Sequence, residues 1–533
     1  MKLLFAQSYY LKFDPKLYDA MQPYPPLGTM YAASFMRERG YDVALFDAML
    51  AESEAEFAAA LDLEQPDMAI IYEDNFNYLS KMCLTRMREA AFTMIHLAHE
   101  RGVPVILCGS DATDHAESYL HQGADYVLLG EGELTLAELL DHLSHRQPTS
   151  LNNILGLAYA HNGDSSQPVS QSARQQNSKL ETQNSKLETH RTPRRPDIKQ
   201  VNELPFPTWD LVDVPRYKKI WLERHGYYAM NMVTTRGCPY HCNWCAKPIW
   251  GQRYNSRSPE NVARELKWLK ETYQPDYIWL ADDIVGIRPR WWQEFADWVE
   301  KLDARVPFKC LSRADLIVRN DADVKALARA GCDIVWMGAE SGSQKILNAM
   351  DKGTTVEQIA EATRRLHEVG VRVAFFLQFG YPGETRDDLE KTLQMVRDCQ
   401  PDDIGMSVSY PLPGTKFHNN VKLQLGDKQN WVDSADLEMM YQGPFTTAFY
   451  RQLHIVLHKE FRSRKQWREL TRDWQKGKVR LGQVRTAAAI AYRLATLPLA
   501  RLKLNHLSTI PHQGIPALPH MSLEDAAAPS PQE

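Results

Sequence analysis

Two series of short apolar runs, each alternating with helical patterns, restrict the folds that this chain can adopt. Strands that alternate with helices form right-handed βαβ units, and such units build a parallel sheet with helices on both faces. The first series predicts strands at residues 2–7, 42–47, 67–72, 103–109 and 125–129. Five strands within one domain length predict a flavodoxin-like, Rossmann-type domain over residues 1–150.

The second series begins after residue 200 and predicts an open, partial (β/α)6 TIM-like barrel over residues 201–430. Ser258 before Pro259 predicts one helix start, and Thr354 with Glu357 predicts a capping box at another. The active site is expected at the carboxyl ends of the strands, as in complete barrels. The predicted strands lie at residues 231–235, 277–281, 308–312, 334–338, 371–379 and 404–410.

The segment between the two series, residues 151–200, has the composition of a linker. Gln-Asn-Ser-Lys-Leu-Glu-Thr at residues 176–182 recurs unchanged at residues 183–189. Two copies with one apolar residue each are too few for a coiled coil, so the sequence predicts a disordered, duplicated insertion.

After residue 430 the alternation of strands and helices ends, and residues 431–510 predict a small helical region. Its helices are expected at residues 450–470 and 479–504, and Pro498 is expected to kink or end the second. The last stretch, residues 511–533, holds several prolines and small residues and predicts a disordered tail.

Composition narrows the class of protein. The formal net charge of −5 gives no global signal for nucleic acid. No uninterrupted run of eighteen apolar residues occurs, so no membrane span is expected, and the apolar start is too brief for a signal peptide. Eight cysteines without the density of a disulfide scaffold predict a reducing, cytoplasmic location.

Three of these cysteines, Cys238, Cys242 and Cys245, lie together at C-x3-C-x2-C spacing. Gly237 and Pro239 interrupt the preceding apolar run, so the cysteines are expected on a loop that leaves a strand. Three thiolates can hold three irons of a cubic iron–sulfur cluster and leave the fourth iron open to a ligand.

Two alternatives concern other ligands. A structural zinc site would use His241 as a fourth ligand, but such sites usually combine two separated pairs and no second pair is present. Cys310, on the third predicted barrel strand, is a candidate fourth cluster ligand, a candidate catalytic thiol, or a small buried residue.

The cysteine spacing, with Trp244 before the last cysteine, resembles that of the radical S-adenosylmethionine (SAM) superfamily. The resemblance implies that Cys238, Cys242 and Cys245 bind a 4Fe–4S cluster and that the amino acid end of SAM chelates the fourth iron. Electron transfer would then cleave SAM to methionine and a 5′-deoxyadenosyl radical. The electron donor would be a protein such as flavodoxin or ferredoxin.

The same resemblance implies SAM contacts at the ends of the later barrel strands. A carboxylate after the second strand would accept hydrogen bonds from the SAM ammonium, and an arginine after the third would hold its carboxylate. A glutamate after the fourth strand would bind ribose, and glycines after the fifth would let backbone approach adenine. The tract after the second strand departs from the Gly-Gly-Glu of many members, because Asp282 and Asp283 stand there. The candidate residues are Asp282, Asp283, Arg313, Glu340, Gly380 and Gly383.

The first domain looks like the cobalamin-binding domain that precedes many radical SAM domains. The matching tracts are Pro25 to Gly28, Gly40 to Val43, Gly109-Ser110 and Gly130 to Glu133. No D-x-H-x-x-G motif occurs, so cobalamin is expected without a histidine on its lower face. The alternative is the same fold with an empty pocket. The candidate contacts are Tyr9, Tyr72, Gly109, Ser110, Gly130, Glu131 and Gly132.

Three functions follow from these resemblances. The first is a cobalamin-dependent radical SAM enzyme that transfers a methyl group to an unactivated carbon of a small molecule. The second keeps the cofactors but performs oxidative cyclisation or rearrangement, as in the anaerobic magnesium-protoporphyrin monomethyl ester cyclase. The third is a sensor that binds cobalamin or an iron–sulfur cluster without turnover, and the full set of SAM-facing tracts argues against it.

Overall fold

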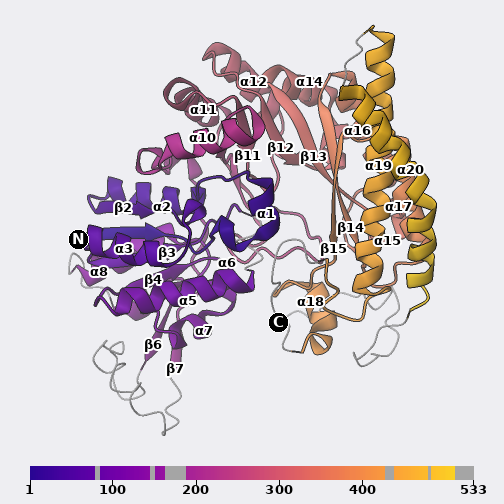
Figure 1. The fold of residues 1–533 in the computed structure, drawn as a ribbon. Helices are drawn as coiled ribbons and strands as arrows, with labels where there is room; N and C mark the ends of the chain where they lie inside the picture. The colour runs from indigo at the N-terminus through magenta and orange to yellow at the C-terminus, as the bar shows by residue number, and fades with distance from the viewer. Residues whose placement is uncertain (78–83, 145–149, 162–187, 427–436, 478–481, 511–533) are drawn as a thin grey trace.

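The computed structural model describes residues 1–77, 84–144, 150–161, 188–426, 437–477 and 482–510 (Figure 1). The predicted tail at 511–533 and residues 162–187, which hold nearly all of the duplicated heptapeptide, lie outside the described residues. Within the described residues, no helix is both long enough and apolar enough to cross a membrane.

The N-terminal domain contains the predicted flavodoxin-like sheet. Its parallel strands run in the order β2-β1-β3-β4-β5, which confirms the predicted topology. The predicted strand ends agree with the observed ones to within two residues, because the interior of each strand is an apolar run. The strands are β1 (Lys2–Ala6), β2 (Asp42–Phe46), β3 (Met68–Tyr72), β4 (Val105–Cys108) and β5 (Tyr126–Leu128).

Two further strands, β6 (Leu157–His161) and β7 (Glu188–Arg191), continue this sheet antiparallel from β5. They lie within the segment predicted as a linker, so part of that segment belongs to the first sheet. Glu-Thr-His-Arg of β7 shows no alternation of apolar and polar residues, which is why sequence patterns gave no sign of an edge strand there.

Helices cover both faces of the first sheet, and each face has its own apolar core. One face packs against α3 (Ala55–Glu64), α5 (Thr85–His99) and α7 (Ala116–His121). The other packs against α2 (Leu27–Glu38) and α8 (Glu133–Leu143).

The second sheet is parallel throughout, in the order β15-β14-β13-β12-β11-β8. Because β8 and β15 do not pair with each other, the sheet forms the predicted open, partial barrel. Its strands are β8 (Ala229–Met232), β11 (Tyr277–Leu280), β12 (Phe308–Ser312), β13 (Cys332–Glu340), β14 (Arg372–Phe379) and β15 (Asp403–Val408). The helices between them include α11 (Pro259–Tyr273), α12 (Trp291–Lys301), α13 (Ala314–Arg319), α14 (Asp321–Ala330), α15 (Gln344–Ala349), α16 (Val356–Glu368) and α17 (Arg386–Cys399).

The helix starts agree with the sequence in one case and differ by a residue in the other. The side chain of Ser258 accepts a hydrogen bond from the backbone N–H of Asn261, as predicted. The capping box of α16 uses Thr355 and Gln358 rather than Thr354 and Glu357. The Thr354 hydroxyl accepts a hydrogen bond from Arg313 at 3.0 Å, so a contact from the end of the neighbouring strand β12 takes the side chain that the sequence assigned to the cap.

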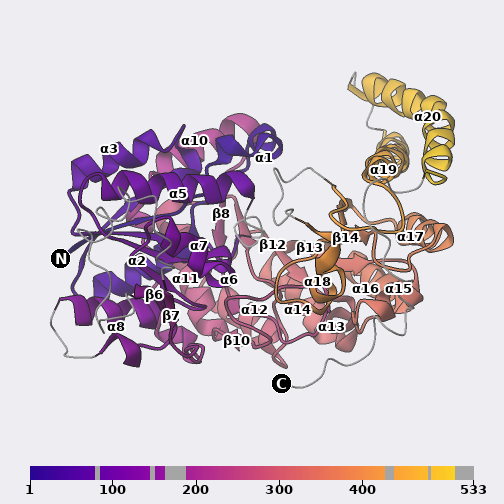
Figure 2. The same cartoon turned by 90° about the horizontal axis from the view of Figure 1, so that it is seen from below.

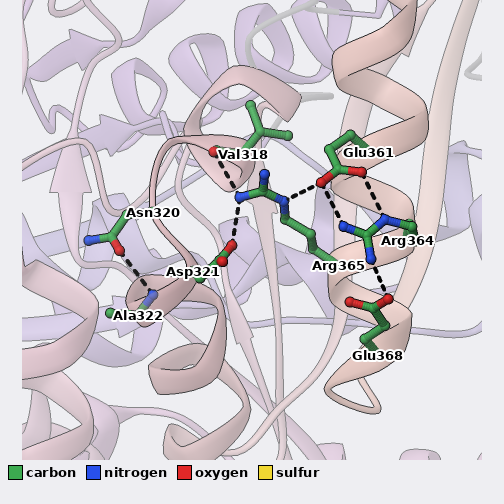
Figure 3. Close-up of polar contacts among 8 residues, drawn as sticks. All are labelled: Val318, Asn320, Asp321, Ala322, Glu361, Arg364, Arg365 and Glu368. Carbon is green, nitrogen blue, oxygen red and sulfur yellow. Dashed lines mark hydrogen bonds and ion pairs between the residues drawn. The ribbon is translucent and has the colours of Figure 1, made fainter.

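Ion pairs fix α16 to its neighbours on the barrel surface (Figure 3). Arg365 donates to the carbonyl oxygen of Val318 at 3.0 Å and to Asp321 at 2.6 Å, and Glu361 accepts from Arg364 and Arg365. Exposed pairs of this kind contribute little stability individually, so their main effect is to orient α16 against α13 and α14.

The C-terminal region is a pair of long helices, α19 (Thr447–Gln475) and α20 (Gly482–Leu507), beside α17 (Figure 1). Pro498 does not end the second helix, which continues to Leu507. Gln452 of α19 donates a hydrogen bond to the carbonyl oxygen of Ala500 at 3.0 Å, and this packing helps α20 continue past the proline.

Candidate functional site

The three clustered cysteines lie on a loop that follows β9 (Thr235–Arg236) at the carboxyl end of β8. β9 pairs antiparallel with β10 (Asn255–Ser256), so the single strand predicted at 231–235 is divided in two. Gly237 has a φ of 81°, and a Cβ there would come within 2.5 Å of the carbonyl oxygen of Arg253. The loop therefore requires glycine immediately before Cys238.

Asp282 holds the base of this loop. Its buried carboxylate accepts the backbone N–H groups of Thr234 and Thr235 at 2.8 and 2.6 Å, and the Thr234 hydroxyl at 3.0 Å. Burial raises the pKa of Asp282 to about 6, against these hydrogen bonds. The neighbouring Asp283 is exposed, and its charge acts on Cys238 and Cys245. Of the two aspartates predicted to contact the SAM ammonium, Asp283 is thus the one whose carboxylate lies at the loop surface.

Asn243, between the second and third cysteines, ties the loop to the opposite side of the barrel. Its side-chain amide donates to the carbonyl oxygen of Ala349 at 2.7 Å, and its backbone N–H donates to that of Met350 at 3.1 Å. The Tyr381 hydroxyl lies 2.9 Å from Asn243 Oδ1. Sequence reasoning did not single out Asn243 or Tyr381, because nothing local marks a contact between positions 138 residues apart.

Arg313, after β12, reaches the second cysteine of the loop. Its Nη1 lies 3.8 Å from Cys242 Sγ, and its guanidinium stacks 3.7 Å from the centre of the Tyr240 ring. Nη2 donates to the carbonyl oxygen of Lys352 at 2.6 Å. The predicted SAM-carboxylate anchor is therefore brought beside the cysteines.

Glu340, at the end of β13, lies in a strained part of the same edge. Its φ is 55°, which side chains other than glycine rarely adopt, and the register of β13 with β14 shifts between Gly338 and Glu340. Its carboxylate accepts a hydrogen bond from buried Lys352 at 2.7 Å. Burial opposes the charge of Lys352, but Glu340 and Cys242 raise its pKa overall. Sequence patterns gave no sign of Lys352.

The backbone of the glycine-rich tract after β14 forms hydrogen bonds within the tract and with a residue near the C-terminal helices. Gly380 has a φ of 80°; its N–H donates to Glu384 at 2.7 Å, and its carbonyl oxygen accepts from Tyr441. The Gly383 carbonyl oxygen accepts from Lys345 at 3.0 Å. Both glycines lie at the carboxyl edge of the barrel, and their contact with adenine remains a prediction.

The donor chemistry of the cysteine loop fits an iron–sulfur cluster. Burial raises the pKa of Cys245 to about 12 and also raises that of Cys238, while the charge of Lys247 opposes both shifts. Three thiols on one loop beside Lys247 and Arg313 match thiolates that bound iron would hold deprotonated. His241 is exposed. Within the described ranges no three His, Cys, Asp or Glu side chains are placed to bind a single metal ion, and this finding covers the three loop cysteines as well.

Cys310 lies elsewhere. It is fully buried in the apolar core, on the face of β12 that packs against the outer helices, and it neighbours Cys332. Its position matches the small buried residue, the last of the three interpretations offered for it.

The carboxyl edge of the first sheet collects buried polar atoms that have no hydrogen-bond partner among the described residues. They are Tyr10 Oη after β1, Glu73 Oε2 and Asn75 Oδ1 after β3, and Ser110 Oγ after β4. Burial raises the pKa of Glu73 to about 7. Unsatisfied buried polar atoms are costly, and four along one edge fit a ligand rich in amides, which the corrin periphery provides.

Several residues predicted to contact cobalamin are used within the domain itself. A Cβ at Gly109 would lie 2.8 Å from the Glu73 side chain, and one at Gly132 would lie 2.6 Å from Cys108 Sγ. Tyr9 donates from its hydroxyl to Asp14 at 3.3 Å, and the Tyr72 hydroxyl accepts from the Gly132 N–H at 3.3 Å. At Gly130, with a φ of 79°, a Cβ would come within 3.3 Å of the carbonyl oxygen of Ile249 in the second domain. Packing thus accounts for these glycines, and of the predicted set only Ser110 has a buried polar atom without a partner in the part of the chain that the structure describes.

Glu131 and Glu133, after β5, form ion pairs with Arg236 of β9, the strand that leads into the cysteine loop of the second domain. Arg236 Nη1 lies 2.6 Å from Glu131 and Nη2 lies 2.8 Å from Glu133, and all three side chains are buried. Trp250 donates to Glu131 at 3.2 Å and stacks on Phe76, which follows β3. We call Arg236, Glu131 and Glu133 the interdomain triad. It fixes the carboxyl edge of the first sheet against the base of the cysteine loop.

Family comparisons agree with this arrangement. Residues 232–396 match the model of the radical SAM superfamily, and residues 19–140 match that of the B12 binding domain. The chain is a radical SAM enzyme with a B12-binding domain. A radical SAM domain implies a 4Fe–4S cluster and SAM, together with a small-molecule substrate and a reductant, and a B12-binding domain implies cobalamin.

Individual relatives cover most of the chain. It is 28% identical to an uncharacterized methyltransferase of Pyrococcus horikoshii, over 74% of this chain and 77% of the relative. It is 24% identical to the anaerobic magnesium-protoporphyrin IX monomethyl ester cyclase of Rubrivivax gelatinosus, over 77% and 68%. The solved structure of the cobalamin-dependent S-adenosylmethionine radical enzyme OxsB with aqua-cobalamin bound superposes with a TM-score of 0.66 at 18% identity. That match covers 94% of this chain and 72% of the other, and it confirms the fold.

Proposed function

We propose that this radical SAM enzyme transfers a methyl group to an unactivated carbon of a small molecule. The observation that carries the proposal is the interdomain triad, because it fixes the B12-binding edge against the base of the three-cysteine loop. Methyl transfer requires both cofactors to face one substrate, and proximity of this kind accounts for a large part of catalysis.

Residues of the second domain would bind the cluster and SAM. Cys238, Cys242 and Cys245 would hold a 4Fe–4S cluster, and residues 201–430 would form its domain. Arg313 would hold the SAM carboxylate, with Asp283 nearer to its ammonium than Asp282. When bound, the cluster supplies one electron for SAM cleavage, and cobalamin supplies a carrier for the methyl group. Flavodoxin or ferredoxin, available in a reducing cytoplasm, would deliver the electron.

Glu340 would bind the ribose of SAM through the carboxylate oxygen that Lys352 leaves free, and Gly380 and Gly383 would lie along adenine. Residues 1–150 would hold cobalamin at Tyr10, Glu73 and the edge that follows β4. This support comes from geometry at two strand edges, and each residue can be tested singly.

Anaerobic reconstitution with SAM, cobalamin and a reductant tests the reaction type. Methyl transfer predicts S-adenosylhomocysteine in an amount close to that of bound cobalamin, even before a substrate is supplied. Mass spectrometry of the quenched mixture measures it. Formation of 5′-deoxyadenosine without S-adenosylhomocysteine would instead favour cyclisation or rearrangement, the activity named for the Rubrivivax gelatinosus relative.

The lower face of cobalamin gives a second expected result. The residues that follow β1 and β3 within the described ranges, 7–14 and 73–77, contain no histidine. Electron paramagnetic resonance of the Co(II) protein is therefore expected to lack splitting from an axial protein nitrogen. His115, beyond Ser110, lies 3.8 Å from Asp111, so His115→Ala should leave the spectrum unchanged. Nitrogen splitting that disappears in this variant would contradict the assignment.

A further inference from the structure

The inner face of the barrel sheet can be identified from the packing of its strands. Phe308 of β12 stacks on Trp292 of α12, so it points outward to the helices. Successive residues of a strand point to opposite faces, and the next residue, Lys309, therefore points inward. On β14, Phe375 and Leu377 are buried, whereas Phe376 between them is 39% exposed and lies on the inner face.

Two aromatic rings line one side of this inner face. Trp336 of β13 and Phe376 stack with ring centres 4.7 Å apart. Gly405 of β15 pairs with Phe376, and its missing side chain leaves the ring uncovered on that side. A large apolar ring this exposed on an interior strand is an open contact surface for a flat ligand.

A lysine occupies the other side. Lys309 Nζ lies 5.0 Å from the centre of the Trp279 ring and 5.5 Å from that of Tyr24. No ion pair or hydrogen bond with a carboxylate is found for it among the described residues, and burial lowers its pKa to about 8. Lys309 is half-buried, and a partly desolvated ammonium without a paired anion would be stabilised by a bound one.

A polar atom completes the surface. Gln378 is two residues beyond Phe376 and so points to the same face. Its side chain is 3% exposed; its amide nitrogen donates to Ser409 at 3.2 Å, while its Oε1 has no hydrogen-bond partner within the described ranges. It can accept a hydrogen bond from a ligand lying against Phe376.

The approach to this face is also positively charged. His454 and His458 of α19 have ring centres 4.2 Å apart, and the charges of Lys16 and Arg462 act on both rings. Lys16 belongs to α1 (Pro15–Ala20), and Figure 2 shows α1 and α19 on the same side of β12, β13 and β14. Cations from both helices on that side would attract an anionic ligand.

We propose that the substrate is a planar, unsaturated small molecule with one anionic group. Its ring system stacks on Phe376 and Trp336, its carboxylate or phosphate pairs with Lys309, and a hydroxyl or N–H donates to Gln378. β12 and β14 are two strand spacings apart, about 10 Å, and the register places Lys309 level with Arg372, four residues before Phe376. The two Cα atoms are therefore about 16 Å apart along the sheet, a distance that the Lys309 side chain and a molecule of two to four fused rings, lying obliquely across the strands, span together. This proposal rests on the proposed function and names the class of its substrate.

The test uses the reconstituted holoenzyme and defined probes. 2-Naphthoate, 1-pyrenebutyrate and 2-naphthyl phosphate are titrated by calorimetry, with 2-naphthamide as the uncharged analogue. We expect the acids to bind, and naphthamide to bind about tenfold more weakly than naphthoate. Lys309→Met should weaken acid binding by about the same factor and leave naphthamide unchanged, while Lys309→Arg should keep most of the affinity. Comparison of naphthoate with naphthyl phosphate tells which anion fits better.

Matched variants separate this surface from general effects. Lys301 lies 4.1 Å from the Trp298 ring on the outer helix α12, so Lys301→Met removes a similar lysine without affecting probe binding. Phe376→Ala should weaken naphthoate and naphthamide alike, whereas Trp467→Ala, at an exposed site on α19, should weaken neither.

Equal binding of acid by wild type and Lys309→Met, or no binding of any acid at millimolar concentration, would overturn the proposal. SAM turnover in the same preparation is a separate reading. A protein that cleaves SAM but ignores the acids keeps the proposed function and loses only this inference.

Discussion

Replacing Cys238, Cys242 or Cys245 by Ala is expected to abolish formation of 5′-deoxyadenosine from SAM. Each cysteine would contribute one of three thiolates, and a cluster held by two is poorly retained. The anaerobically reconstituted variants should show loss of the visible iron–sulfur absorption and of bound iron, together with loss of the nucleoside measured by chromatography.

Cys399→Ala provides the control, because this cysteine is also partly exposed but lies on α17, outside the loop. It should keep iron content and SAM cleavage near those of the wild type. Sustained formation of 5′-deoxyadenosine by the triple Cys→Ala protein would refute both the cluster assignment and the radical mechanism.

Arg236→Met is expected to destabilise the protein strongly, because it leaves Glu131 and Glu133 buried without their cation. Breaking a buried ion pair by removing one partner costs about 3–5 kcal/mol. Thermal or urea unfolding of the reconstituted protein, followed by circular dichroism, measures this loss. The variant should also retain less cobalamin after gel filtration, because the first sheet no longer sits firmly on the cysteine loop.

A compensating variant distinguishes charge burial from a general packing defect. Adding Glu131→Gln and Glu133→Gln to Arg236→Met removes the unpaired charges, so the triple variant should be more stable than Arg236→Met alone. Arg264→Met, which breaks an exposed pair with Glu260 on α11, should cost less than about 1 kcal/mol. Equal stability of the Arg236 and Arg264 variants would contradict the structural role of the interdomain triad.

The positions of the parallel strands in both sheets could be predicted because each strand is a short apolar run bounded by turn residues. The edge strand β7 could not, since its polar residues owe their conformation to pairing with β6. The cap of α16 shifted by one residue because Arg313, at the end of the neighbouring strand β12, donates a hydrogen bond to Thr354. Local patterns therefore failed where a distant side chain competed for the same group.

The features of the candidate site likewise differ in whether local sequence or a distant contact determines them. The sequence alone determined the cysteine loop, since three thiols and Gly237 lie within a few residues of one another and need no distant partner to be recognised. Only the tertiary structure decided that Asp282 anchors that loop while Asp283 faces outward, and that Glu131 meets Arg236 from 105 residues away. It likewise decided that Lys309 points inward beside Trp279 and Tyr24. These outcomes depend on which charged side chains are buried together in the folded protein. Contacts between residues so far apart in the sequence produce no local sequence pattern from which they could be predicted.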